Sequence, residues 1–242
     1  MSLTVSFGAA LAEADTVSIM SYNIRNARGM DEKTDYKRLA DVILRESPDI
    51  VAVQEIDSVT GRSKGVDVLR KIADITKMYG VFGAAIDFDG GKYGIGILSK
   101  EQPLSHYSVA LPGREELRRL LVVEFEKYVV GCVHLSLNAE DRLLSAEIIR
   151  REAAKSNKPF FLAGDLNDTA KSGLIKNLKE DFLILNNPEN PTFPADTPKT
   201  CIDFIFYYTG KGGEKPFTVL SDRVIDEGVA SDHRPVAVEI RF

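Results

Sequence analysis

Polar side chains that could do chemistry lie at the ends of apolar runs along almost the whole sequence. Residues 51–55 (VAVQE) and 161–165 (FLAGD) are typical, because each predicts a buried strand that stops on a carboxylate. Such groups are costly to bury unless a metal ion, a proton or a hydrogen-bonding partner satisfies them. Six segments end in this way, and their polar residues are Asn23, Glu55, His134, Asp165, Asn167, Asp203, Asp232 and His233.

These residue types are the ones that hydrolysis of a phosphoester needs. The reaction must draw negative charge off the phosphoryl oxygens, make a nucleophile from water and help the leaving oxygen depart. Mg²⁺ prefers oxygen ligands, which the carboxylates of Glu55 and Asp232 and the amide of Asn23 could supply. An imidazole beside a carboxylate, as Asp203 and His233 could provide, is oriented and polarised. The set therefore indicates a metal-assisted phosphoesterase.

The elements that would position these residues alternate over the first 80 residues. An extended run over residues 16–23 is followed by apolar residues at helical spacing, and Pro48 ends that helix. Residues 49–56 form a continuous apolar strand, and the apolar residues between 69 and 76 lie on one face of a second helix. The pattern predicts strand, helix, strand and helix.

The rest of the chain is richer in strands. An antiparallel meander is predicted over residues 81–88, 93–98, 104–110, 117–125 and 128–137. A helix should begin after Asn138, followed by a strand over residues 160–163 and a short helix around residues 174–178. Three last strands are expected near residues 201–208, 217–220 and 236–242.

Two blocks of strands with helices outside them predict an α/β fold. We expect a four-layer α/β/β/α sandwich, in which two mixed β-sheets pack face to face and helices flank them. At 242 residues and 44% hydrophobic composition, residues 16–242 should form one catalytic domain. The site should lie at one edge, where the strand ends converge.

Composition narrows the class of substrate. The net charge of −5 and a pI near 5.4 argue against a protein that binds by neutralising many nucleic-acid phosphates. A small-molecule or lipid-like phosphoester is therefore favoured, with a nuclease acting on DNA or RNA as the alternative. No apolar run approaches the roughly 20 residues that span a bilayer, so no transmembrane segment is expected.

Residues 1–15 resemble a leader. The segment is small and apolar and contains Ala10-Leu11-Ala12, which resembles the cleavage site of a secretory signal, although the basic start of such a signal is missing. Export to the periplasm or the outside is the favoured expectation, and a cytoplasmic location is the alternative. The two cysteines, Cys132 and Cys201, are expected to be buried free thiols, although the sequence leaves a disulfide between them open.

The sequence resembles the endonuclease/exonuclease/phosphatase superfamily from about residue 17 to residue 242. The resemblance lies in seven short stretches that occur in the family's order. They are residues 21–25 (SYNIR), 48–55 (PDIVAVQE), 93–99 (YGIGILS), 133–135 (VHL), 164–168 (GDLND), 202–206 (IDFIF) and 231–235 (SDHRP). The resemblance implies the layered fold described above and a hydrolase that uses Mg²⁺, with Mn²⁺ as a possible substitute.

The resemblance also implies a role for each polar residue. Glu55 would be the principal metal ligand, and Asn23 and Asp232 would complete or support the coordination. Asp165 would orient or deprotonate the attacking water, and Asn167 would hold a phosphoryl oxygen. His134 would stabilise charge on the phosphoryl group or assist the leaving oxygen. His233, aligned by Asp203, would contact the phosphate or act as acid or base, and the choice of general base between Asp165 and His233 stays open.

Other positions have competing interpretations. Arg25 and Arg62 resemble positions in bacterial members of the family where a guanidinium could grip a phosphoryl oxygen, and solvated surface arginines are the alternative. Arg142 fits a helix surface or a brace under the site, and Asp168 is expected to cap the next helix. A binding module without turnover is a third class of function, but all the acids and histidines of the family's pattern are present.

Overall fold

Twelve strands in two sheets form the centre of the molecule, as the computed structural model shows for residues 16–210 and 217–242. The predicted leader at residues 1–15 lies outside the described residues. The first sheet contains β1 (Thr16–Asn23), β2 (Ile50–Ser58), β3 (Tyr79–Phe88), β4 (Gly91–Ser99), β11 (Thr218–Val224) and β12 (Val236–Arg241). The second contains β5 (Ser105–Leu111), β6 (Arg118–Glu124), β7 (Val129–His134), β8 (Phe160–Asp165), β9 (Phe182–Ile184) and β10 (Asp203–Tyr208).

The strand orders are β11-β12-β1-β2-β4-β3 and β5-β6-β7-β8-β10-β9. Each sheet has one parallel pair, β1–β2 in the first and β7–β8 in the second, and its other pairs are antiparallel. Both sheets are therefore mixed, as the sequence predicts.

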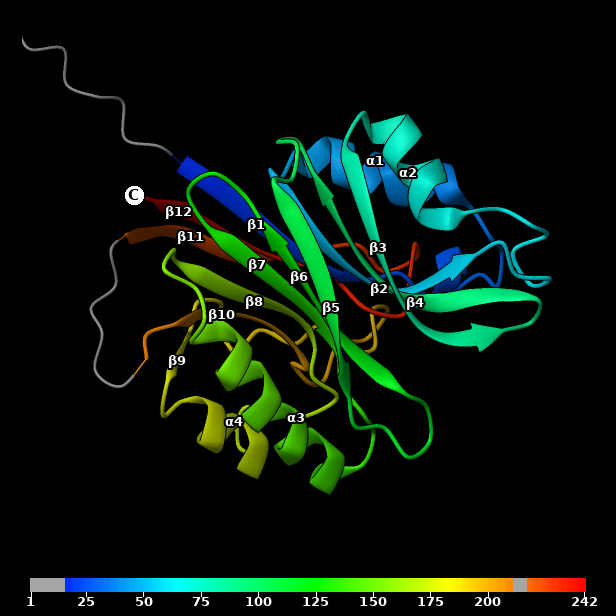
Figure 1. Ribbon diagram of the computed structural model, residues 1–242. Helices are drawn as coiled ribbons and strands as arrows, with labels where there is room; N and C mark the ends of the chain where they lie inside the picture. Colours follow the sequence, from blue (N-terminus) through cyan, green and yellow to red (C-terminus); the bar gives the residue numbers. More distant parts are fainter. Residues whose placement is uncertain (1–15, 211–216) are drawn as a thin grey trace, which may run out of the picture.

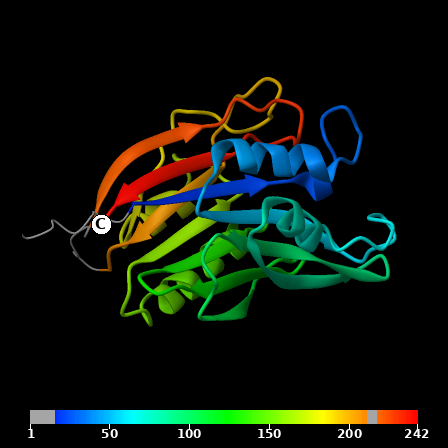
Figure 2. The ribbon, with the colours of Figure 1, turned by 90° about the horizontal axis from the view of Figure 1, so that it is seen from above.

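Helices cover the two outer faces, which confirms the predicted four layers (Figure 1). The helices are α1 (Tyr36–Glu46), α2 (Val68–Thr76), α3 (Ala139–Ala153) and α4 (Gly173–Leu178), with a short 3-10 turn, η1 (Arg25–Ala27). Helices α1 and α2 pack on the first sheet and α3 and α4 on the second. Figure 2, seen from above, shows α1 lying over the first sheet.

Alternation along the strands explains this layering. On β1, Ile19 points into the core between the sheets, whereas Met20 points out to the core under α1 and α2. On β8, Phe161 and Phe160 divide in the same way between the inter-sheet core and the core under α3 and α4. Strands buried on both faces read as continuous apolar runs, which is the pattern of the sequence.

Side chains close the N-terminal ends of the four helices. Asp35, Asp67, Asn138 and Ser172 each accept a hydrogen bond from a backbone N–H in the first helical turn. The cap at Asn138 was predicted correctly. The predicted cap at Asp168 was wrong, because Ser172 caps α4.

The predicted single meander is also wrong as a unit. Strands β3 and β4 pair in the first sheet, and β5, β6 and β7 pair in the second, so the chain changes sheets between Ser99 and Ser105. The reason is that Ile95 on β4 and Leu121 on β6 both face the core between the sheets. These strands stack on each other instead of pairing edge to edge. The short strand β9 was not predicted.

Both cysteines are free and buried, which confirms the interpretation as unpaired thiols. Burial raises the pKa of Cys132 to about 12, and burial with the nearby Asp203 charge raises that of Cys201 to about 12. Because the thiolate is the reactive form, we expect the native protein to react far more slowly with a thiol-specific reagent than the unfolded protein does. Dithionitrobenzoate titration at mildly alkaline pH, with and without concentrated guanidinium chloride, measures this. Rapid reaction of either thiol in the native protein would contradict the burial.

In the part of the chain that the structure describes, no helix is long and apolar enough to cross a membrane.

Candidate metal centre and catalytic site

Three predicted site residues become neighbours through the pairing of the second sheet. The parallel pair β7–β8 places His134 opposite Asp165, and the antiparallel pair β8–β10 places Asp165 opposite Asp203. All three stand at a strand terminus, so their side chains meet at one edge of the sheet. All three are also buried.

The first sheet brings Asn23 and Glu55 to the same edge. Asn23, the last residue of β1, is opposite Gln54 on β2, so Glu55 lies one position further. Pairing of β2 with β4 shifts register at this point, and Glu55 adopts a left-handed backbone with φ of 61°. A side-chain-bearing residue held there costs on the order of 1–3 kcal/mol, and such strain clusters at functional sites. The bulge turns the Glu55 carboxylate toward Asn23.

The amide of Asn23 joins the two sheets. Its Nδ2 donates to Glu55 Oε1 and to Asp165 Oδ2, both at 3.0 Å. Its Oδ1 accepts the backbone N–H of Arg25 at 3.1 Å. One lone pair of the oxygen that could bind a cation is therefore already engaged, and the NH₂ group orients Glu55 and Asp165, so this geometry favours a supporting role for Asn23 over direct coordination.

The carboxylate cluster fits a divalent cation. Burial raises the pKa of Glu55, and the charges of Asp232 and Asp165 raise it further, against the opposing effect of the Asn23 hydrogen bond. Asp232 is partly exposed beside this cluster. Hard oxygen donors that repel one another in a partly buried site are what Mg²⁺ or a similar ion would bring together.

A carboxylate–imidazole pair lies beside Asp165. His233 Nδ1 is 2.9 Å from Asp203 Oδ2, and Thr192 Oγ donates to the same oxygen at 2.5 Å. Within the described residues, Asp203 Oδ1 is buried with no hydrogen-bonding partner. Burial alone lowers the pKa of His233, but the Asp203 and Asp165 carboxylates outweigh it and raise the pKa to about 10. His233 is therefore held as an imidazolium.

His134 is the second imidazole beside Asp165. Its Nε2 lies 3.6 Å from Asp165 Oδ2, and the corresponding distance from His233 Nε2 is 3.7 Å. Burial lowers the pKa of His134 to about 4, with Arg118 adding to the effect and Asp165 opposing it. The two imidazoles beside one carboxylate thus differ in charge at neutral pH.

A second group of possible metal ligands includes the Asp203–His233 pair. Asp165, Asp203 and His233 each place one ligand atom within 4.8 Å of the others. An ion between them would have to break the hydrogen bond from His233 to Asp203. For this reason we regard the Glu55 side as the better metal site.

Asn167 and Arg25 complete the near side of the site. The backbone N–H of Asn167 donates to Asp165 Oδ1 at 2.8 Å, and its Nδ2 donates to the Leu135 carbonyl at 2.9 Å. Asn167 also has a left-handed backbone, with φ of 50°. Arg25 Nε lies 3.7 Å from Asp232 Oδ2, and its Nη1 donates to Glu32 at 3.2 Å.

Arg62 lies on the β2–α2 connection and is held by a buried acid. Its Nε and Nη2 donate to the two oxygens of Asp57 at 2.9 and 2.8 Å. The guanidinium carbon lies 4.7 Å from the Phe88 ring centroid and 5.6 Å from that of Tyr93. Arg62 is 40% exposed in its side chain, so its remaining donors can reach solvent or a ligand.

Arg142 acts as a brace under the site, as one interpretation of the sequence predicts. It is buried and donates through Nη1 to the carbonyls of Ser136 and Leu137 at 3.0 and 2.7 Å. Its Nε donates to Asp168 Oδ2 at 3.1 Å. Asp168 is therefore tied to α3 rather than capping α4.

The profile of the endonuclease/exonuclease/phosphatase family matches residues 20–233. The chain belongs to this family. Members are divalent-metal-dependent hydrolases of phosphoester bonds, and this chain is such a hydrolase. The predicted resemblance is confirmed. A search of curated protein sequences gives no significant match.

Solved structures of the endonuclease/exonuclease/phosphatase family share the fold. A family protein from Beutenbergia cavernae has a TM-score of 0.80 at 24% identity, covering 94% of this chain and 72% of that one. A mannosyl-6-phosphatase from Bacteroides thetaiotaomicron has a TM-score of 0.73 at 18% identity, covering 93% and 100%. D. rerio TDP2 with a single-strand DNA product also has a TM-score of 0.73 at 18% identity, covering 94% and 99%.

Three side chains that support the site were not singled out from the sequence. Thr192 donates to Asp203, Ser231 Oγ donates to the Asn23 carbonyl at 2.7 Å, and Arg118 contacts His134. Thr192 lies in a Pro- and Asn-rich loop where hydroxyl groups are common, so its position carries no signal. Arg118 is the first residue of β6, directly after a charged turn, where an arginine is ordinary.

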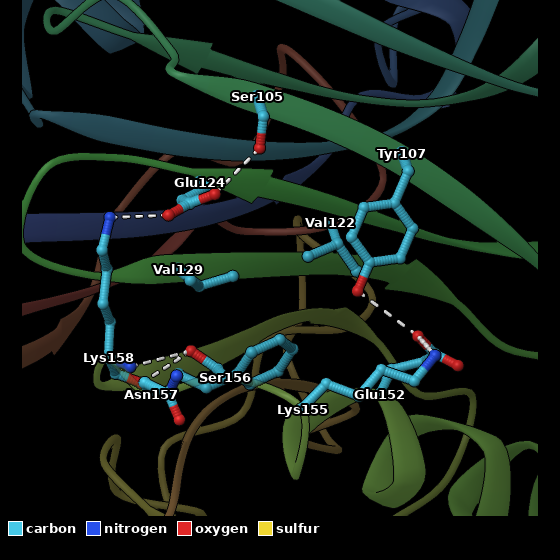
Figure 3. A pocket seen from close by; sticks show the side chains of 11 residues that line it. Ser105, Tyr107, Val122, Glu124, Val129, Glu152, Lys155, Ser156, Asn157 and Lys158 are labelled. Carbon is cyan, nitrogen blue, oxygen red and sulfur yellow. Dashed lines mark hydrogen bonds and ion pairs between the residues drawn. The ribbon is translucent and has the colours of Figure 1, made fainter.

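A pocket beside β5 and the C-terminal end of α3 is separate from the site (Figure 3). Lys158 pairs with Glu124 and Lys155 with Glu152, each at 2.6 Å, above an apolar floor that includes Phe160. None of the predicted site residues lines it. Its two carboxylates are each paired with a lysine, and neither a histidine nor an aspartate lines it, so this pocket does not offer the residue types of the candidate site.

The raised pKa of His233 predicts a pH dependence of stability in metal-free protein. Folding raises the pKa from 6.5 to about 10, so the stabilisation is fully present below 6.5 and is lost as the pH rises through 10. We expect the free energy of unfolding to fall with pH over this window more steeply in the natural protein than in His233→Gln. Urea titrations in EDTA measure both slopes. Equal slopes would show that His233 does not carry the effect.

Proposed function

We propose that the protein is a Mg²⁺-dependent phosphatase or phosphodiesterase that acts on a small-molecule or lipid-like phosphoester. The observation that supports the proposal is the Asn23 amide between Glu55 and Asp165, because its hydrogen bonds hold the acid proposed to bind the metal and the acid proposed to bind the water on either side of one fixed group. A phosphoryl group that reaches both acids would lie between a cation and an activated water.

Residues of the first sheet would hold the ion. Glu55 would be its principal ligand and Asp232 a second one, with Asn23 orienting the Glu55 carboxylate. When bound, Mg²⁺ supplies positive charge to a phosphoryl oxygen and makes a nearby water more acidic. Mn²⁺, which also accepts oxygen ligands, is expected to substitute.

Residues of the second sheet and the β11–β12 connection would move protons and bind oxygens. Asp165 would orient the attacking water and accept its proton. His233 is protonated at neutral pH because of Asp203, so it fits a donor to a phosphoryl or leaving oxygen better than a base. Asn167 and His134 would donate hydrogen bonds to the phosphoryl group.

The charges around the site favour a compact substrate. Arg25 and Arg62 each pair with one or more carboxylates, so they offer directed N–H donors but no stripe of free positive charge. Binding of a long nucleic acid depends on many unpaired Lys and Arg side chains. A single phosphoester, gripped by Arg25 or Arg62, needs only one or two donors.

One panel of substrates tests the proposal against a nuclease. Purified protein is assayed with MgCl₂ on p-nitrophenyl phosphate, bis(p-nitrophenyl) phosphate, phospholipid vesicles, plasmid DNA and an abasic oligonucleotide, with Glu55→Gln in parallel. We expect turnover of the small or lipid esters that needs the metal and is lost in the variant. Faster turnover of either nucleic acid would make the protein a nuclease, and no metal-dependent turnover of any ester would support a binding module.

A further inference from the structure

The two ring nitrogens of His134 face different partners. Nδ1 lies 3.1 Å from Nη1 of Arg118, and Nε2 lies 3.6 Å from Asp165 Oδ2. Both Arg118 and His134 are buried, so water competes little for either contact. The partner on the Nδ1 side is a cation, although a carboxylate or carbonyl is the usual way to orient a catalytic imidazole.

The chemistry of the guanidinium decides where the proton of His134 resides. Arginine has only N–H donors and stays charged in proteins. At 3.1 Å its N–H must point to a lone pair, so Nδ1 carries no proton. A neutral imidazole has one N–H, which must then be on Nε2. The burial that lowers the pKa of His134 agrees with a neutral ring.

Arg118 is itself held in place. Its Nη2 lies 3.3 Å from Glu115 and its Nη1 3.1 Å from Glu116. Glu115 in turn accepts the backbone N–H of Leu137 and the hydroxyl of Ser136, both at 2.8 Å. These bonds link the turn before β6 to the segment that follows β7, so the guanidinium cannot swing away from the ring without breaking several contacts.

We propose that Arg118 is a positioning residue that fixes His134 as a neutral imidazole with its proton on Nε2, which makes His134 a hydrogen-bond donor to the phosphoryl group or leaving oxygen. The N–H is available because 3.6 Å from Asp165 is beyond a hydrogen bond. Arg118 does not touch the reacting atoms. The donor role rests on the proposed phosphoesterase function, whereas the tautomer does not.

The tautomer can be read without substrate or metal. The chain has three histidines, so ¹⁵N-histidine labelling and long-range ¹H–¹⁵N spectra give three rings, which His106→Gln and His233→Gln assign. We expect His134 at neutral pH to show an unprotonated Nδ1 and a protonated Nε2. In Arg118→Met the ¹⁵N signal of Nδ1 should shift, because Nδ1 loses its hydrogen-bond donor and its tautomer is no longer fixed, and in Arg118→Lys, which keeps a cationic donor, the shift should be smaller.

Arg119 provides the matched control. It adjoins Arg118 on β6, but its Nη1 donates to Ser108 Oγ at 3.3 Å and no hydrogen bond joins it to His134. Arg119→Met should leave the His134 spectrum unchanged. A doubly protonated ring or a protonated Nδ1 in the natural protein would overturn the proposal, and so would an unchanged His134 spectrum in Arg118→Met. If Arg118→Met fails to fold, the natural protein and Arg118→Lys still decide.

Kinetics separates positioning from binding. With p-nitrophenyl phosphate or its bis-ester and MgCl₂, Arg118→Met should lower kcat by roughly 10- to 100-fold, less than the roughly 100- to 1000-fold that loss of an oxyanion donor causes. KM should change little, because Arg118 does not contact substrate. A rise in KM with unchanged kcat would show that Arg118 binds substrate. If neither ester is hydrolysed, the phosphoesterase proposal fails, while the spectra still test the tautomer.

Discussion

Glu55→Gln should lose nearly all metal-dependent turnover. Glutamine keeps the size of the side chain and an oxygen but loses the charge that would hold the cation against water. A bound divalent ion is worth several kcal/mol of transition-state stabilisation, and about 4 kcal/mol corresponds to about a 1000-fold loss of rate. We therefore expect kcat to fall by at least about 1000-fold and the Mg²⁺ dependence to move to higher concentration. Steady-state rates over a Mg²⁺ series and calorimetric titration with Mg²⁺ or Mn²⁺ measure both effects.

Glu126→Gln controls for the change in charge, because Glu126 is an exposed acid outside the site. Its rate and metal dependence should match those of the natural protein. Desolvation and neighbouring acids disfavour the charge of the partly buried Glu55, so its removal should also leave the metal-free fold as stable as before, or more stable. Unchanged Mg²⁺ affinity in Glu55→Gln would show that the ion binds elsewhere, with the Asp165, Asp203 and His233 group as the next site to test.

Asp203→Asn should lower turnover by a similar or larger amount without weakening the metal. In a Ser-His-Asp triad, the same change of the buried aspartate lowers kcat about 10,000-fold because the imidazole loses its correct protonation. Here one carboxylate oxygen accepts from both Thr192 and His233, and the second oxygen has no hydrogen-bonding partner among the described residues. Asparagine either turns its NH₂ toward His233 or buries an unpaired NH₂. We expect kcat to fall roughly 1000- to 10,000-fold.

The matched control is Asp181→Asn. Asp181 is also a buried carboxylate and pairs with Arg150, but it lies outside the site. Its loss should lower the melting temperature and leave the turnover of folded protein intact. If Asp203→Asn weakened Mg²⁺ binding as much as Glu55→Gln, the division between a metal side and a proton side would be wrong.

The layers and the strand ends could be predicted because both depend on local pattern. Apolar runs that stop on Glu55 or Asp165 indicate which residues are buried and where each strand ends. The partition of strands between sheets could not be read in this way, because β4 and β6 present equivalent apolar faces whether they pair or stack. The two arrangements are pairing within one sheet and stacking between two sheets. Only the tertiary packing of Ile95 in the core between the sheets distinguishes them.

The chemistry of the site was predictable at the level of residue type, but its hydrogen bonds were not. The sequence places Asn23 near an acid, yet it does not show that the amide oxygen is turned to Arg25 and the NH₂ to Glu55 and Asp165. Thr192 and Arg118 were missed for the same reason, because a single hydroxyl in a loop or a single guanidinium at the start of a strand forms no repeating pattern. Such contacts depend on tertiary approach between segments far apart in the chain.

The Asn23–Asp165 bond joins the two sheets, and the His233–Asp203 bond joins the β11–β12 connection of the first sheet to the second sheet. Side chains such as Phe161 and Ile205 fill the core between the sheets. The packing of this core therefore sets the distance between the two halves of the active centre. Truncation of such a core side chain, far from any bound phosphate, should lower the rate of hydrolysis before it unfolds the protein. Enzymes with this fold should therefore tolerate substitutions in their outer helices much better than in the core between the two sheets.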